Sequence, residues 1–223
     1  QYPQSVAAFD SLVTRFPGGY RADRALFQIG EAYFALGDNA AAIAAYRRLV
    51  ESQGLERMSE REMLQMKREK LAGLVDETAL DLAAKALIRI GVCHERLGQY
   101  DQAAAAFERI ATQFADERRL VEEAYRRQAD MYYSAGDFDA CIQVYRRAIE
   151  AQQEAAGRAR MQLLLANRFF ETGHFAEAIE EYNVFRYTYA ELAERVGLPL
   201  EGAGLQVAKA WFGRAEAAGA DSA

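Results

Sequence analysis

The chain has 223 residues, of which 51% are hydrophobic and 27% are charged, so it has the composition of a protein that folds around buried apolar surface. Its net charge of −6 and the lack of a continuous basic stripe argue against a nucleic-acid-binding protein. The sequence contains no run of 18 or more apolar residues, which excludes a transmembrane helix of ordinary length.

One short pattern recurs four times along the chain. It consists of a glycine, a polar residue, usually an aromatic residue, then a small residue and an aromatic residue four positions further on. The copies lie at 36–46, 97–107, 135–145 and 172–182 and read LGDNAAAIAAY, LGQYDQAAAAF, AGDFDACIQVY and TGHFAEAIEEY. Their glycines, Gly37, Gly98, Gly136 and Gly173, are 61, 38 and 37 residues apart. A period in the thirties indicates a solenoid of helix pairs.

The chain opens inside one of these units. Residues 4–17 are expected to form the second helix of a truncated first unit, which ends at Phe16-Pro17. Because the chain starts with Gln1 and not with methionine, we expect a fragment or a mature form, with any targeting segment or lipid anchor lying upstream. No proline occurs from 18 to 198, so nothing in that stretch forces a helix to break.

The unit at 20–52 shows how one helix pair is built. Apolar residues recur at helical spacing on both sides of Gly37, which is expected to end the first helix in the left-handed conformation. Small Gly30 and Ala42 allow the two helices to approach closely, while Tyr33 and Tyr46 fill the space beside them. Neither helix can bury its apolar stripe alone, so neighbouring units must stack.

Three further units are expected at 77–114, 117–151 and 158–190, followed by a terminal helix at 203–217 whose Trp211 covers the last open face. Polar Gln128, His94 and Gln162 stand at core positions and are expected to loosen packing. The residues at the repeated positions are, for the three units in order, Leu87, Ile90, Gly91, His94, Gly98, Ala103, Phe107 and Ile110; Tyr125, Gln128, Ala129, Tyr132, Gly136, Cys141, Tyr145 and Ala148; and Gln162, Leu165, Ala166, Phe169, Gly173, Ala178, Tyr182 and Phe185.

These positions resemble the tetratricopeptide repeat (TPR) family over 1–55 and 84–190. The resemblance implies an all-α fold, a right-handed α-α superhelix of about five helix pairs, in which 1–223 is one solenoid domain and 1–17 a partial first repeat. It also implies that the chain is a scaffold that binds other proteins in a concave groove.

The 61-residue spacing indicates an insertion at 55–75. Ser59 and Glu62 form a capping-box pattern, so a helix is expected near 60–72, and three of the five methionines lie here: Met58, Met63 and Met66. Two interpretations remain: the insertion binds a partner, or it packs on the edge of the solenoid.

The sequence offers no pattern for catalysis, a cofactor or a metal. Cys93 and Cys141 fall inside helical patterns and are expected to be small core residues. Of the two histidines, His94 replaces an aromatic core residue and His174 lies in a glycine turn. Cys93, His94 and Glu95 are consecutive on a helix and point in different directions, so they cannot together bind a metal ion. We therefore expect a protein that is not an enzyme and that holds no cofactor.

The partner-binding residues are inferred from the resemblance, because TPR proteins line their groove with first-helix residues off the core stripe. Several of them are apolar and are rimmed by charged residues, which is typical of a binding surface; alternatively, the superhelix or a neighbouring segment covers this face. The predicted partner-binding residues are Phe27, Glu31, Phe34, Lys85, Ile88, Arg126, Asp130, Tyr133, Arg160, Leu163, Asn167 and Phe170.

The sequence thus predicts a non-catalytic scaffold that binds a protein or peptide segment within a larger complex, and no nucleic acid. The alternative is a structural accessory domain or subunit of a larger enzyme or secretion complex. Of the clamp by which chaperone-binding TPRs hold a C-terminal carboxylate, only Asn167 matches, so chaperone-tail binding is not expected. The Phe16-Pro17 ending and the period resemble bacterial cell-envelope TPR proteins, which implies a periplasmic or outer-membrane-associated location; the alternative is cytoplasmic.

Overall fold

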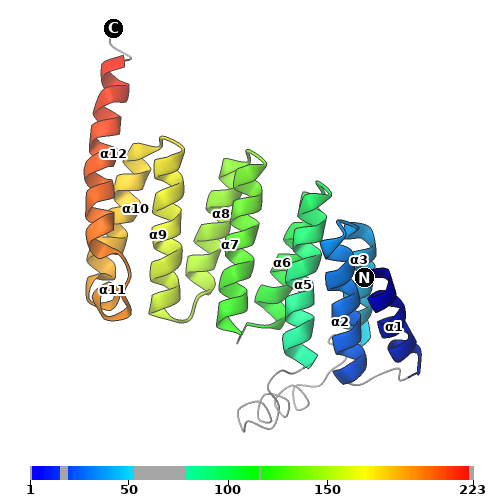
Figure 1. The fold of residues 1–223 in the computed structure, drawn as a ribbon. Coiled ribbons are helices and arrows are strands. Elements are labelled where there is room, and N and C mark those ends of the chain that lie inside the picture. The colour runs from blue at the N-terminus through cyan, green and yellow to red at the C-terminus, as the bar shows by residue number, and fades with distance from the viewer. Residues whose placement is uncertain (1, 16–19, 53–78, 116, 221–223) are drawn as a thin grey trace. The chain divides into compact units, whose positions relative to one another are not determined.

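The computed structural model describes residues 2–15, 20–52, 79–115 and 117–220, and within these ranges it contains eleven helices and no strand (Figure 1). The all-α prediction is confirmed, whereas the predicted insertion at 55–75 and its helix lie outside the described residues. The helices are α1 (Tyr2–Arg15), α2 (Tyr20–Ala35), α3 (Asn39–Ser52), α5 (Ala79–Arg96), α6 (Tyr100–Gln113), α7 (Arg118–Ser134), α8 (Phe138–Ala151), α9 (Ala155–Glu171), α10 (Phe175–Thr188), α11 (Ala190–Val196) and α12 (Leu200–Ala220).

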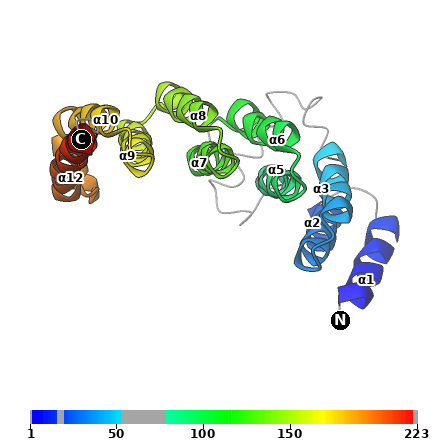
Figure 2. The ribbon, with the colours of Figure 1, turned by 90° about the horizontal axis from the view of Figure 1, so that it is seen from above.

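The helices group into two compact units, residues 1–124 and 125–223. In the first unit, α2 packs on α3 and α5 packs on α6, and α3 also packs on α5, so that each pair covers the next. Figure 2 shows α2 and α5 in one row and α3 and α6 in the other. In the second unit, α9 packs on α10 in the same way. We call α2, α5, α7 and α9 the A helices and α3, α6, α8 and α10 the B helices.

Each helix pair turns through a glycine in the left-handed conformation. Gly37, Gly98, Gly136 and Gly173 have φ angles of 78°, 70°, 79° and 77°. At the first turn, the Asp38 N–H donates to the Tyr33 carbonyl and the Gly37 N–H to the Phe34 carbonyl, and the other three turns repeat both bonds. This pattern satisfies carbonyls that the end of the A helix would otherwise leave unpaired.

The core of each helix pair is built where a small residue on one helix faces an aromatic ring on the other. Ala42, Ala103 and Ala178 of the B helices are fully buried. On the A helices, a β-carbon added at Gly30 would lie 2.3 Å from Cε1 of Tyr46, and one added at Gly91 would lie 2.6 Å from Cε1 of Phe107. The predicted close approach of the two helices therefore occurs, and it depends on these small residues.

Two of the polar core residues, His94 and Gln162, are hydrogen-bonded within the fold. The buried His94 contacts Gln99 Oε1 through Nδ1 at 2.6 Å and Arg47 through Nε2 at 3.2 Å. Since an arginine can only donate, Nε2 accepts and Nδ1 carries the hydrogen. Gln162 donates through Nε2 to the Glu181 carboxylate at 2.6 Å. Both side chains are thus satisfied where the pattern has an apolar residue.

The second unit ends in two helices after its last repeat. The seven-residue α11 and its left-handed Gly197 were not anticipated from the sequence. The longer α12 packs against α10 through small residues, including the buried Ala203 and Ala210. The expected terminal helix therefore covers the last B helix, but not through Trp211, which is itself 53% exposed. Leu205 and Phe212 of α12 are also exposed.

Within the ranges given above, no helix combines the length and the apolar character needed to cross a bilayer.

Candidate functional site

The predicted partner-binding residues all lie on A helices, and they fall into two sets. Phe27, Glu31 and Phe34 lie on α2, and Lys85 and Ile88 lie on α5, all in the first unit. The second unit holds the remaining residues, which are Arg126, Asp130 and Tyr133 on α7 and Arg160, Leu163, Asn167 and Phe170 on α9. We call these sets, with the arginines described below, the α2–α5 surface and the α7–α9 surface.

On the α2–α5 surface, an arginine joins the two helices. Arg89 of α5 binds the Glu31 carboxylate of α2 with two hydrogen bonds, of 2.7 Å from Nε and 2.9 Å from a terminal nitrogen. The same guanidinium lies over the Phe34 ring, 4.7 Å from its centroid, and Arg96 lies over that ring at 3.9 Å. Bidentate pairing and stacking on the ring fix both the acid and the aromatic side chain in place.

The rest of this surface is less open than the sequence predicts. The ring of Phe27 is half-buried and packs on Tyr46, with 5.6 Å between centroids. Ile88 is only 7% exposed, because its side chain lies among the packed helices, so it contributes to the core more than to a binding surface. Lys85 is exposed.

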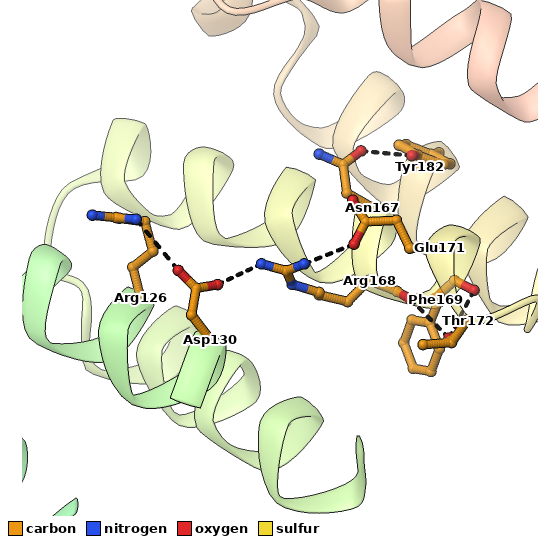
Figure 3. Close-up of polar contacts among 8 residues, drawn as sticks. All are labelled: Arg126, Asp130, Asn167, Arg168, Phe169, Glu171, Thr172 and Tyr182. Carbon is orange, nitrogen blue, oxygen red and sulfur yellow. Dashed lines mark hydrogen bonds and ion pairs between the residues drawn. The ribbon is translucent and has the colours of Figure 1, made fainter. Parts of the chain in front are cut away.

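The α7–α9 surface has a second arginine-centred network (Figure 3). Arg168 of α9 forms an ion pair with Asp130 of α7, and it also pairs with Glu171 at 2.7 Å. Arg126 reaches the other oxygen of Asp130 at 3.3 Å. The Arg168 guanidinium lies over the Tyr133 ring, 4.4 Å from its centroid. Two arginines and two acids thus neutralise one another around one aromatic side chain.

Both surfaces have the same construction. An acidic residue and an aromatic residue three positions later stand on one A helix, Glu31 with Phe34 and Asp130 with Tyr133. An arginine from the next A helix of the same unit binds the acid and covers the ring. The sequence pattern predicts the acids and the rings of these surfaces, but it does not predict Arg89 and Arg168. These arginines occupy different positions within their repeats, so no single position of the repeat identifies them.

A second regularity connects each A helix to its own B helix. The Tyr46 hydroxyl donates to Glu31 Oε1 at 2.5 Å, and the Tyr182 hydroxyl donates to Asn167 Oδ1 at 2.6 Å. Both pairs are separated by 15 residues along the chain. The equivalent pairs in the other two repeats are Asp130 with Tyr145, and Val92 with Phe107.

The four pairs follow one rule. Where the buried aromatic residue carries a hydroxyl, the residue 15 positions earlier carries a side-chain oxygen; where it is phenylalanine, that residue is valine. Tyr145 differs in detail, because its hydroxyl lies beside the Arg168 guanidinium without a hydrogen bond of normal geometry. A buried hydroxyl needs a polar neighbour, whereas a buried phenyl ring does not.

Because these tyrosines are buried, we expect the protein to lose stability at alkaline pH. Burial raises the pKa of both Tyr145 and Tyr182 from 10.0 to about 12, although Arg168 opposes the shift at Tyr145. Because the folded-state pKa is the higher one, the stabilisation is complete below pH 10 and is lost as the pH rises toward 12. We expect the free energy of unfolding to fall over this window, with phenolate absorbance at 295 nm from the buried rings appearing together with loss of helical circular dichroism. Ionisation of all twelve tyrosines near pH 10 with unchanged helicity would contradict this expectation.

The other predicted residues of α9 also have defined environments. Phe170 packs edge-on against Phe175, with 5.6 Å between ring centroids, and is half-buried. Leu163 and Arg160 are half-buried on the same helix. Asn167 uses its carbonyl oxygen for Tyr182, so its amide NH2 group is a further donor beside the arginines of this surface.

These groups can recognise a partner, but they do not form an obvious reaction centre. Across the described ranges, no group of three or more His, Cys, Asp and Glu side chains is placed to bind a metal ion. Burial raises the pKa of the Cys93 and Cys141 thiols to about 11 in each case, although nearby arginines oppose the shift. Such thiols are poor nucleophiles at neutral pH. What remains exposed is a set of aromatic faces, guanidinium groups and carboxylates.

Several solved structures are similar to this chain at low sequence identity. BtubC (BKLC) from P. vanneervenii is 17% identical, with 98% of this chain and 90% of that chain covered and a TM-score of 0.49. A putative kinesin light chain of Podosopora anserina with TPR-like repeats is 13% identical, with 89% and 90% covered and a TM-score of 0.49. MamA is 16% identical, with 97% and 91% covered and a TM-score of 0.46.

Among curated proteins, none matches the chain significantly. The family model of the tetratricopeptide repeat, in contrast, matches residues 1–55, 68–118, 94–157 and 126–193. These matches cover most of the sequence, including all four glycine turns and both arginine-centred surfaces. The chain therefore belongs to the tetratricopeptide repeat family.

Proposed function

We propose that the chain is a non-catalytic scaffold that binds a segment of a partner protein on the exposed surfaces of its A helices. The observation that carries this proposal is the arginine-centred construction of the α2–α5 and α7–α9 surfaces. In each, an aromatic ring is held in place from within the chain and yet remains only half-buried. Side chains that are ordered before binding lose little entropy when a partner docks, so they suit recognition.

The chemistry of these surfaces indicates how affinity and selectivity would be divided. Phe34 and Tyr133 supply large, rigid faces, and aromatic residues dominate the energetics of protein interfaces. The arginines and acids around them would select a partner by its charge pattern. The amide NH2 of Asn167 is suited to a carbonyl oxygen of the bound segment.

The test is to identify the partner by crosslinking in the native organism and then to measure its affinity for purified variants. In the double variant Phe34→Ala/Tyr133→Ala, we expect binding to weaken by about tenfold or more, while helical circular dichroism stays near that of the wild type. The matched control is Tyr187→Ala/Phe212→Ala, which removes two exposed aromatic rings from α10 and α12. If only the control weakens binding, the working surface lies at the C-terminal helices and the proposal fails.

The alternative function is that of a structural accessory domain or subunit of a larger enzyme or secretion complex. In that case the array would be held by its ends or by the 55–75 insertion, and the Phe34→Ala/Tyr133→Ala variant would bind its complex normally. A place in a bacterial envelope complex, periplasmic or outer-membrane-associated, remains a prediction from the Phe16-Pro17 ending, and cytoplasmic location remains its alternative. Fractionation of the native organism with an antibody against the chain distinguishes these locations.

A further inference from the structure

Arg96 differs from the other arginines of the two arginine-centred networks described above, because each of those is paired with an acid. It is the last residue of α5, it is exposed, and its guanidinium lies 3.9 Å from the centroid of the Phe34 ring. Its neighbour over the same ring, Arg89, is neutralised by two hydrogen bonds to Glu31. In the part of the chain that the structure describes, Arg96 forms no ion pair or hydrogen bond with any acid. Its position is therefore fixed by stacking while its N–H groups stay available.

The α7–α9 surface shows what a neutralised version of this construction looks like. There, Asp130 and Glu171 together balance Arg126 and Arg168. Around Phe34, two arginines face the single carboxylate of Glu31. The two surfaces share this construction, but the two arginines over the Phe34 ring have one carboxylate between them, which Arg89 binds.

The position of Arg96 at the end of helix α5 does not by itself explain why its N–H groups have no acceptor among the described residues. The C-terminus of a helix favours a positive charge, so a cation there is stabilised by the helix dipole. A guanidinium, however, carries five N–H donors in a planar fork that matches a carboxylate, and no acceptor in the described residues receives them. Apolar surface also lies close in sequence, because Leu36 and Leu97 are exposed in the turns that follow Phe34 and Arg96.

We propose that Arg96, stacked on Phe34, binds a side-chain carboxylate of the partner segment, so that the α2–α5 surface selects an acidic segment. The inference rests on the proposed function and adds the partner's chemistry to it. The partner's Asp or Glu takes the place that Glu171 fills on the α7–α9 surface. Arg89 and Glu31 hold the ring and do not compete for this carboxylate, because their charges neutralise each other.

The experiment uses random dodecapeptides displayed on phage and selected on the whole chain as wild type, Arg96→Gln, Arg96→Lys and Arg48→Gln. Arg48→Gln is the matched control, because it removes an exposed arginine of the B helix α3 that already has an acidic partner, Asp10, and that lies on neither surface. Affinities of recovered peptides are then measured by fluorescence anisotropy on the same proteins. We expect Asp and Glu to be enriched in peptides selected on the wild type and on Arg48→Gln, and not in those selected on Arg96→Gln. The acidic peptides should bind Arg96→Gln about tenfold or more weakly, with Arg96→Lys between the two.

Two outcomes overturn the inference in distinguishable ways. If the recovered peptides lack acidic residues but lose binding in Phe34→Ala/Tyr133→Ala, the proposed function stands and the role of Arg96 falls. If no peptide is recovered, or if binding is indifferent to that double variant, the proposed function itself fails, and this inference fails with it. A lower melting temperature of Arg96→Gln with unchanged peptide selection would mean that Arg96 serves only the end of helix α5.

Discussion

Replacing Gly30 or Gly91 with alanine is expected to lower the free energy of unfolding, although alanine is the better helix former. Within a helix the change from glycine to alanine would by itself stabilise by about 1 kcal/mol. At Gly30, however, the added β-carbon would lie 2.3–2.6 Å from three ring atoms of Tyr46, and at Gly91 it would lie 2.6–3.0 Å from those of Phe107. Both rings are essentially unexposed, so they cannot swing aside without pushing the two helices apart. Overpacking of this kind costs roughly 1–3 kcal/mol and outweighs the gain in propensity.

The matched control is Gly204→Ala in α12. There the nearest atoms to the added β-carbon belong to Arg186, at 3.6–3.7 Å, which is ordinary contact. This variant should therefore be as stable as the wild type or up to about 1 kcal/mol more stable. Urea unfolding followed by circular dichroism measures all three variants. If Gly30→Ala behaved like Gly204→Ala, the helices of the repeat would not be as closely packed as described.

The hydrogen-bonded pair of the last repeat, Tyr182 and Asn167, is expected to give a strongly non-additive double-mutant cycle. Asn167→Val would leave the Tyr182 hydroxyl buried without an acceptor, which costs roughly 1–3 kcal/mol. Tyr182→Phe would cost about 0.5–1.5 kcal/mol, because the half-buried Asn167 oxygen can bind water instead. The double variant reproduces the Val92–Phe107 pair of the third repeat, so it should unfold with nearly the free energy of the wild type.

The same cycle can be run in the opposite direction. Phe107→Tyr places a hydroxyl opposite Val92, whose side chain has no oxygen to accept it, and is expected to destabilise by roughly 1–3 kcal/mol; adding Val92→Asn should restore most of the loss. Free energies of unfolding from urea titrations give the coupling in both cycles. Additive effects would show that the aromatic residue and its partner 15 positions earlier act independently, and the rule that relates them would be wrong.

Much of the fold could be predicted because its determinants are local in sequence. The four glycine turns were placed correctly, since a left-handed residue flanked by helical patterns has few alternatives to glycine. The short α11 was missed: it contributes only Ala193 to the core, and a single buried residue leaves no periodicity to detect.

The candidate site was less predictable because its contacts are distant in sequence. The helical period gives the direction of a side chain only to within about one residue, which is how Ile88 was assigned to the surface and is instead buried. Arg89 and Arg168 were missed because a long side chain reaches its partner through several rotatable bonds, which no sequence pattern records. The relation between the tyrosines and their acceptors, in contrast, was present in the sequence as a fixed spacing of 15 residues.

That spacing also bears on the order in which the chain assembles. The Tyr46 hydroxyl closes a loop of 15 residues to reach Glu31, whereas Arg89 must close one of 58 residues to reach the same carboxylate. Because loop-closure entropy rises with loop length, the longer contact costs about 1 kcal/mol more free energy to form. Local contacts of this kind are those that speed folding. We therefore expect each helix pair to form its own short-range contacts first, with the arginines then joining pairs that already exist.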